Sequence, residues 1–76
     1  MPFSNAQLDD INLLCRFNLD STQAGLKIHS AAGPQVQAAA RRLFEKGLIT
    51  QGDGGYLTDL GHKAAEHAQQ LLQILK

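Results

Sequence analysis

A helix bounded by proline and glycine is the feature that most constrains the fold of this chain. Apolar residues recur at helical spacing from Val36 to Leu43, and the charged residues between them fall on the other side. Pro34 suits the first turn of a helix, and Gly47 suits the residue that follows the last turn. We therefore predict an amphipathic helix over residues 34–46.

A glycine-rich segment follows this helix and predicts a reversal of the chain. The sequence GDGG at residues 52–55 lies between two short runs of strand-forming residues. An Asp-Gly pair in such a position is typical of a β-hairpin, and we predict a type I′ turn, which needs positive φ at both central residues. Thr58 then predicts the N-cap of a last helix over residues 59–75.

The beginning of the chain carries a helix start signal. Ser4 and Gln7 have the spacing of a capping box, in which each side chain accepts a hydrogen bond from the backbone of the other residue. Phe3 and Leu8 stand at the positions of a hydrophobic staple around it. We therefore predict a first helix that begins near Asn5.

The segment before the central helix is open to two interpretations. Ser21 or Thr22 could cap a short helix that ends near His29, which would complete a helix-turn-helix with the central helix. Alternatively, residues 25–29 form a strand that adds a third member to the hairpin. We favour the strand, because Gly25 would weaken the interior of a helix by about 1 kcal/mol.

Length and composition limit the classes of protein to which the chain can belong. Its 76 residues leave room for a single domain, which we assign to residues 1–76. Seven basic and seven acidic residues give no net charge, so any nucleic-acid affinity must come from local clusters. Cys15 is the single cysteine, and we interpret it as a small core residue rather than a redox thiol. The sequence shows no signal peptide and no membrane-spanning pattern, which predicts a cytoplasmic protein without membrane contact.

No pattern in the sequence predicts an enzyme, a cofactor, a metal site or a small-molecule substrate. His62 and His67 flank Glu66, but five residues of helix place the two imidazoles about 140° apart, whereas ligands on one helix need i,i+3 or i,i+4 spacing. Asp9 and Asp10 are helical neighbours that point about 100° apart. We interpret them as acids of the first turn that interact with the helix dipole.

The central helix has the residue types that read DNA. In the major groove arginine pairs with guanine and glutamine pairs with adenine. The residues expected on the exposed side of this helix are Gln35, Gln37, Ala38, Arg41 and Arg42. We therefore consider duplex DNA as a partner. The alternative is that Arg41 and Arg42 interact with the dipole at the end of the helix and cover apolar surface with their stems.

The sequence LFEKGLI at residues 43–49, the hairpin, and YLTDLG at residues 56–61 together resemble the recognition helix and wing of bacterial winged-helix regulators. The resemblance implies a small α+β winged-helix-like fold with three main helices, a short hairpin and a third strand near residues 25–29. It also implies that the helix over residues 34–46 contacts DNA. The wing departs from that pattern, because it has no lysine or arginine and presents Asp53, which repels phosphate.

The whole chain is also similar to a small family of gammaproteobacterial proteins of the same length to which no function is assigned. That similarity implies a bacterial cytoplasmic setting. It carries no implication for mechanism.

The apolar positions of the expected helices and strands define an expected core. Leu43 lies in the middle of the central helix and should matter most to stability, whereas Gln69 represents a surface position of the last helix. The residues that we expect in the core are Leu8, Ile11, Leu14, Val36, Ala40, Leu43, Leu48, Leu57, Leu60, Ala64, Ala68 and Leu71.

The sequence LLQILK at the end of the last helix predicts an interface with another protein. Leu71, Leu72, Ile74 and Leu75 place four large apolar side chains in five positions. Positions 72 and 74 are about 200° apart on a helix, so one intramolecular contact does not cover all four side chains. We therefore expect a homodimer or a protein partner that packs against the helix over residues 59–75. The alternative is a frayed terminus in which Leu75 is partly solvated.

Overall fold

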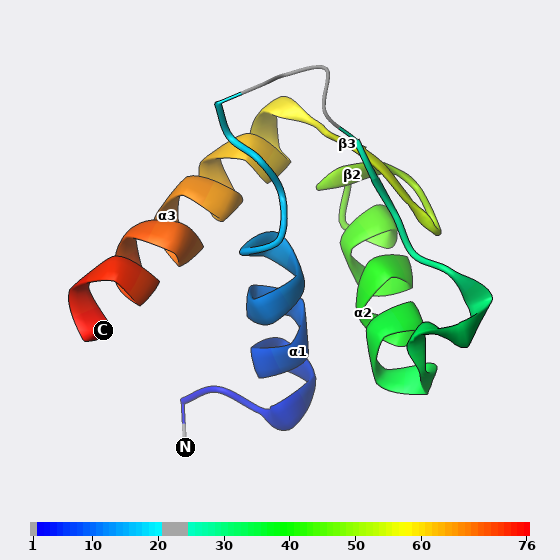
Figure 1. Cartoon of the computed structure of the whole chain (residues 1–76), viewed down its shortest axis with the longest axis horizontal. Coiled ribbons are helices and arrows are strands. Elements are labelled where there is room, and N and C mark those ends of the chain that lie inside the picture. The colour runs from blue at the N-terminus through cyan, green and yellow to red at the C-terminus, as the bar shows by residue number, and fades with distance from the viewer. Residues whose placement is uncertain (1, 21–24) are drawn as a thin grey trace.

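The computed structural model describes residues 2–20 and 25–76, and these form helices and short strands around one apolar core (Figure 1). In chain order the elements are α1 (Asn5–Leu14), β1 (Leu26–Lys27), the 3-10 helix η1 (Ser30–Ala32), α2 (Pro34–Glu45), β2 (Ile49–Gln51), β3 (Gly54–Leu57) and α3 (Asp59–Leu75). The three strands form an antiparallel sheet. The predicted α+β class is therefore confirmed.

α1 lies between the other two helices and packs against both (Figure 1). Its capping box is complete: the Ser4 amide donates to Gln7 Oε1 over 2.9 Å, and the Gln7 amide donates to Ser4 Oγ over 3.1 Å. Phe3 and Leu8 stay 44% and 38% exposed. The first helix thus begins where the sequence predicts, but Leu8 is not a core residue.

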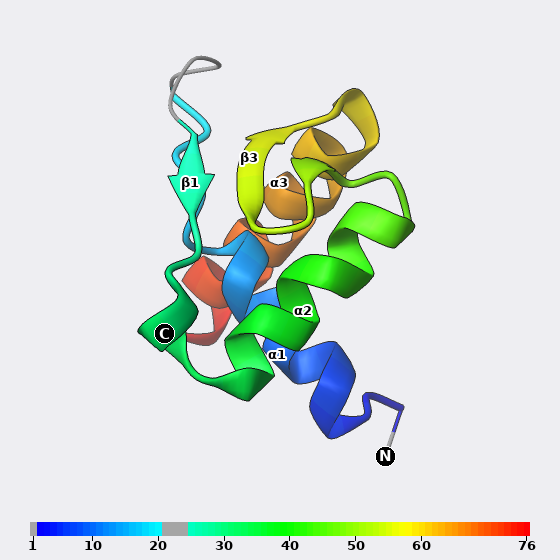
Figure 2. The same cartoon turned by 90° about the vertical axis from the view of Figure 1, so that its right-hand side faces the viewer.

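The favoured strand before the central helix is present. β1 pairs with β3, with Leu26 opposite Gly55 and Lys27 opposite Gly54, and the strand order is β1-β3-β2. The strand is shorter than the expected range 25–29, because the 3-10 turn η1 follows soon after it. The cap residues of the alternative helix, Ser21 and Thr22, lie outside the described residues. Figure 2 shows β1 running beside the hairpin.

The hairpin between β2 and β3 does not contain the predicted type I′ turn. Positive φ occurs at Gly54 (122°) and Gly55 (80°), whereas Asp53 does not adopt it. The pairing register between β2 and β3 shifts between Ile49 and Gln51, because β3 contains a bulge. At this bulge the hydroxyl of Thr50 accepts a 2.9 Å hydrogen bond from the Tyr56 amide. The bulge therefore requires glycine at position 55, because a Cβ there would overlap the Thr50 hydroxyl.

Thr58 joins the end of α2 to the start of α3. Its hydroxyl donates to the Gly47 carbonyl over 2.6 Å and accepts from the Gly61 amide over 3.1 Å, which confirms the predicted N-cap. Gly47 has φ of 78°, in agreement with its predicted place after the helix. Gly61 is buried so close to the chain at Leu48 that a Cβ would overlap the Leu48 carbonyl. Hence α3 starts in direct contact with the loop that follows α2.

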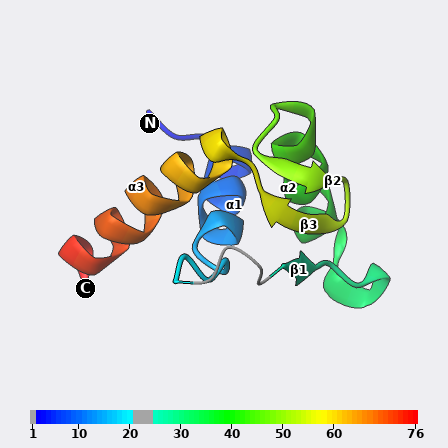
Figure 3. The same ribbon diagram turned by 90° about the horizontal axis from the view of Figure 1, so that it is seen from above.

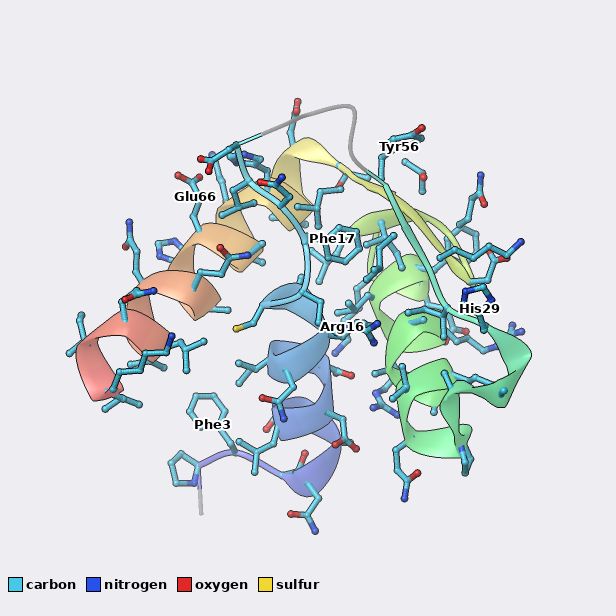
Figure 4. All side chains as sticks on the ribbon, viewed as in Figure 1. Phe3, Arg16, Phe17, His29, Tyr56 and Glu66 are labelled. Carbon is cyan, nitrogen blue, oxygen red and sulfur yellow. The ribbon has the colours of Figure 1, made fainter. Side chains whose placement is uncertain are left out.

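The core lies where the three helices and the sheet meet, and Phe17 points into this region (Figure 4). The buried apolar residues are Leu13, Leu14, Phe17, Ile28, Ala39, Ala40, Leu43, Ile49, Ala65 and Ala68. The prediction of the core is wrong for three leucines that are exposed, namely Leu8, Leu60 and Leu71. The others are buried or half-buried. Figure 3 shows why Leu71 is exposed: the second half of α3 runs away from α1 and the sheet.

Gln69 is not the surface residue that the sequence suggests. Its amide nitrogen donates to the carbonyl oxygens of Leu14, over 3.3 Å, and Phe17, over 2.7 Å. The Leu14 carbonyl is the last of α1 and also accepts a 3.4 Å hydrogen bond from the Phe17 amide, and the Phe17 carbonyl lies just beyond the helix. Gln69 therefore connects the middle of α3 to the end of α1.

Within the described residues, no helix has both the length and the apolar character needed to cross a membrane.

Candidate interaction surfaces

α2 presents four of the five residues that the sequence assigns to DNA contact. Gln35, Gln37, Ala38 and Arg41 are all exposed, while the opposite side of the helix buries Ala39, Ala40 and Leu43. Pro34 starts the helix and gives it a fixed first turn. At 100° per residue, Gln37, Ala38 and Arg41 share one solvent-facing side of α2, whereas Gln35 lies farther round the helix, in line with Arg42.

The fifth residue, Arg42, does not belong to that surface. Its Nη2 lies 2.9 Å from Asp10 Oδ1, and its Nε donates to both carboxylate oxygens, over 3.0 and 3.3 Å. Nη2 also donates to the Ala6 carbonyl over 3.2 Å. The hydrogen bond to Asp10 raises the pKa of Arg42 above its ordinary value, and the charges of Asp10 and Asp9 act in the same direction. Arg42 is therefore a structural residue that links α2 to α1.

This ion pair also corrects the interpretation of Asp9 and Asp10. Neither lies in the first turn of α1, which begins at Asn5. The Asp10 side chain is only 10% exposed and turns toward α2, where Arg42 satisfies it. A buried carboxylate is costly without such a partner, and this one has it. Asp10 is consequently a packing residue and not a helix-dipole residue.

A groove beside α2 brings in residues that the sequence alone did not assign. It has a volume of about 850 Å³ and runs between α2, the end of β1 and the tip of the hairpin. Lys27 and His29 alternate along the chain with the buried Ile28, and both line the groove together with Arg41. Figure 4 shows His29 beside α2. Their alternation with apolar residues was a visible signal, but only the pairing of β1 with β3 places them next to α2.

The tip of the hairpin closes one end of this groove. Asp53 is exposed there, and its backbone carbonyl accepts a 2.7 Å hydrogen bond from the Ile28 amide. The bond holds the end of β1 against the tip. The groove is thus lined by Lys27, Arg41 and His29 on two sides, with one carboxylate at its rim.

The end of α3 forms a second, apolar surface. Leu71 and Leu72 are each 43% exposed, Ile74 is 78% exposed and Leu75 is 73% exposed. α3 remains helical through Leu75, so these are side chains on an ordered helix. All four predicted interface residues therefore present apolar surface to solvent.

The four side chains do not point in one direction. With 100° per residue, Leu72 lies in line with the buried Ala65 and Ala68, which pack in the core. Leu71 and Ile74 lie farther round the helix, about 100° and 160° from Leu72. The apolar surface at the end of α3 therefore wraps around the helix.

The histidines and carboxylates of α3 do not converge. His62 Nδ1 lies 3.2 Å from Glu66 Oε1, the i,i+4 pair expected from the sequence. In the described part of the chain, no three His, Cys, Asp or Glu side chains come together as metal ligands. A shallow depression beside α3, of about 520 Å³, is lined by Leu19, Asp20, Glu66, Gln69, Gln70, Gln73 and Ile74.

Comparison with known proteins identifies the family to which this arrangement belongs. A model described as a family of unknown function, DUF5669, matches residues 1–76, which is the full sequence. The chain belongs to the DUF5669 family. No curated protein and no solved structure matches it significantly. Membership in DUF5669 agrees with the expected similarity to a family without an assigned function. The family description assigns no role to either surface.

Proposed function

We propose that this chain is a small non-catalytic protein-interaction module that associates with a second copy of itself through the end of α3. The observation that carries the proposal is the exposure of Leu71, Leu72, Ile74 and Leu75 on an ordered helix. Proteins that act as monomers rarely expose large contiguous apolar patches, and patches of this kind mark interaction sites. No cofactor is part of the proposal, and the cytoplasmic setting stays a prediction of the sequence.

The chemistry of this surface favours a second copy as the partner. Between Glu66 and Lys76 the helix has no Asp, Glu, Lys or Arg, so charge cannot select a partner there. The surface offers leucine and isoleucine for packing and glutamine for hydrogen bonds. A second α3 supplies the same groups, and most soluble homo-oligomers bury one self-complementary patch around a two-fold axis.

Sedimentation equilibrium at micromolar concentrations tests this function. We expect a monomer–dimer equilibrium that the Ile74→Glu variant shifts to monomer, because each copy then buries a charge in the interface. Gln73→Glu is the matched control, since it places the same charge on the adjacent exposed residue. A monomer at every concentration, or an equal effect of both variants, rejects self-association through these residues.

A second candidate function is nucleic-acid binding through α2. It is supported by the groove in which Lys27, His29 and Arg41 line the same space as the exposed Gln37. Lysine and arginine bind phosphates, while glutamine and arginine read base edges. Because Arg42 is engaged in the ion pair with Asp10, it does not contribute a cation to this surface. Lys27, His29 and Arg41 remain in the groove.

The order of the elements supports the resemblance to winged-helix proteins on which this candidate rests. A strand and a short turn precede α2, a hairpin follows it, and β1 adds to the hairpin as a third strand. Two features reduce the resemblance: η1 spans only Ser30–Ala32 where a helix-turn-helix has a full helix, and Asp53 stands at the tip of the hairpin. Contact through α2 and β1 is therefore favoured over contact through the tip.

A titration of random duplex DNA at several salt concentrations tests the second function. Arg41→Ala should weaken binding and lower the slope of log affinity against log salt by about 1, the value for one phosphate contact. Lys46→Ala removes an exposed cation outside the groove and serves as the control. Absence of binding at low salt, or equal losses in the two variants, contradicts binding through α2.

A further inference from the structure

A stripe of residues that is apolar except at His67 extends along nearly the whole of α3, well beyond the four residues at its end. Leu60, in the first turn of the helix, is 57% exposed although the sequence predicts it in the core. Ala64 is half-buried, and His67 is exposed. With Leu71 and Ile74, these residues follow one another at steps of four, three, four and three positions.

This spacing is that of a coiled-coil seam. Apolar residues at alternating steps of three and four keep one line facing a partner helix, and the seam from Leu60 to Ile74 is about 21 Å long at 1.5 Å per residue. It lies about 100° around the helix from the buried line of Gly61, Ala65 and Ala68. The seam is therefore separate from that buried line, and only Ala64, which is half-buried and packs against the core, touches both.

We propose that two copies of the chain pair along this seam with their α3 helices side by side and antiparallel. The proposal rests on the self-association proposed above and extends it from the end of α3 to the whole helix. It assigns an interface role to Leu60, Ala64 and His67. Leu72, which lies in line with the buried Ala65 and Ala68, is not a member of the seam.

The area available favours the longer contact. A leucine or isoleucine side chain that passes from full exposure to burial removes roughly 100 Å² of apolar surface from water. The end of α3 supplies well under about 400 Å², because Leu71 and Leu72 are each only 43% exposed and Leu72 is outside the seam. A stable interface needs about 800 Å² from each partner. Pairing along the full seam adds Leu60, Ala64 and His67, and it brings the polar residues beside them into contact as well.

The charges at the two ends of α3 favour the antiparallel arrangement. Asp59 stands at the start of the helix and Lys76 directly after its end. If Leu60 of one copy lies opposite Ile74 of the other, Asp59 lies close to Lys76 of the second copy, at both ends of the interface. Antiparallel helices also place opposite dipole ends together. A parallel pair would bring each of these charges next to its own equivalent.

Sedimentation equilibrium of the full chain separates the seam from the shorter contact. Leu60→Glu should raise the dissociation constant of the dimer at least about 100-fold, because each dimer loses two buried leucines. Its helix content should match that of the wild type, and its thermal midpoint should match at concentrations where the wild type is monomeric, since Leu60 is exposed in the monomer. Ile74→Glu should act similarly and Gln73→Glu should not.

The outcomes of this experiment are distinct. If Ile74→Glu dissociates the dimer and Leu60→Glu does not, the function stands and the seam is wrong. If the wild type is monomeric, both are wrong. Orientation is tested by oxidising single-cysteine variants made in a Cys15→Ser background. A mixture of Leu60→Cys and Ile74→Cys should give the mixed disulfide in excess, whereas a disulfide formed mainly between two copies of Leu60→Cys contradicts the antiparallel pairing.

Discussion

The guanidinium of Arg42 on α2 lies 2.9 Å from the carboxylate of Asp10 on α1, with the Ala6 carbonyl as a further acceptor 3.2 Å away. The Asp10 side chain is 10% exposed and that of Arg42 31% exposed, so the pair sits at the edge of the core. A planar guanidinium can hold a carboxylate through two nitrogens, which fixes the distance and rotation between the two helices.

Replacing Arg42 by alanine should destabilise the protein much more than replacing Arg41 by alanine. The first change leaves the largely buried Asp10 without its partner, whereas the second removes an exposed side chain. The urea midpoint should fall clearly for Arg42→Ala and shift little for Arg41→Ala. Similar midpoints for the two variants would show that the ion pair does not hold α1 to α2.

The contribution of Arg42 to stability should persist through alkaline conditions. The Asp10 hydrogen bond raises the pKa of Arg42 in the folded state, so the contribution is present below the unfolded pKa and is lost only as pH rises through the folded value. Both values lie far above neutral pH. The coupling energy from a double-mutant cycle of Asp10→Asn and Arg42→Met should therefore be equal at pH 7 and pH 9. A decrease at pH 9 would contradict this assignment.

Leu43→Ala should cost about 2–5 kcal/mol of unfolding free energy, because Leu43 is almost fully buried at the centre of the core. That is a large part of the roughly 4–11 kcal/mol expected for a domain of this size. Gln70→Ala is a suitable surface control, since Gln70 is exposed while Gln69 bonds to α1. Urea denaturation of both variants provides the comparison. Equal urea midpoints would contradict the assignment of Leu43 to the core.

Gly61→Ala should destabilise the protein even though alanine is the better helix former by about 1 kcal/mol. The added Cβ overlaps the Leu48 carbonyl, and overpacking of this kind costs about 1–3 kcal/mol. Thermal unfolding should show a lower midpoint than the wild type. A higher midpoint would mean that α3 and the loop at Leu48 separate without cost.

Thr58→Ala should cost about 1–2 kcal/mol, the upper range for loss of an N-cap, because the hydroxyl also bonds to the Gly47 carbonyl. Thr58→Ser keeps the hydroxyl and should retain most of the stability. Urea denaturation of the two variants separates the hydrogen bonds from the methyl group. Equal losses would assign the effect to the methyl group instead.

Local sequence signals determined the helices and part of the exposed surface of α2. The capping box of Ser4 and Gln7, the proline at position 34 and the cap at Thr58 each act within a few residues. Hydrogen bonds of such short range form in the same way whatever the rest of the chain does. Gln35 and Arg41 could likewise be placed on an exposed helix face from periodicity alone.

Tertiary structure decided the contacts between residues distant in sequence. Periodicity placed Arg42 on the exposed side, but Asp10, which lies 32 positions earlier, draws its guanidinium toward α1. Lys27 and His29 reach α2 only because β1 adds to the hairpin. The sequence by itself determined where helices begin and end, since those signals depend on neighbouring backbone groups. Only the packing of α1, α2 and α3 decided which polar groups are satisfied within the protein, because their partners come from other elements.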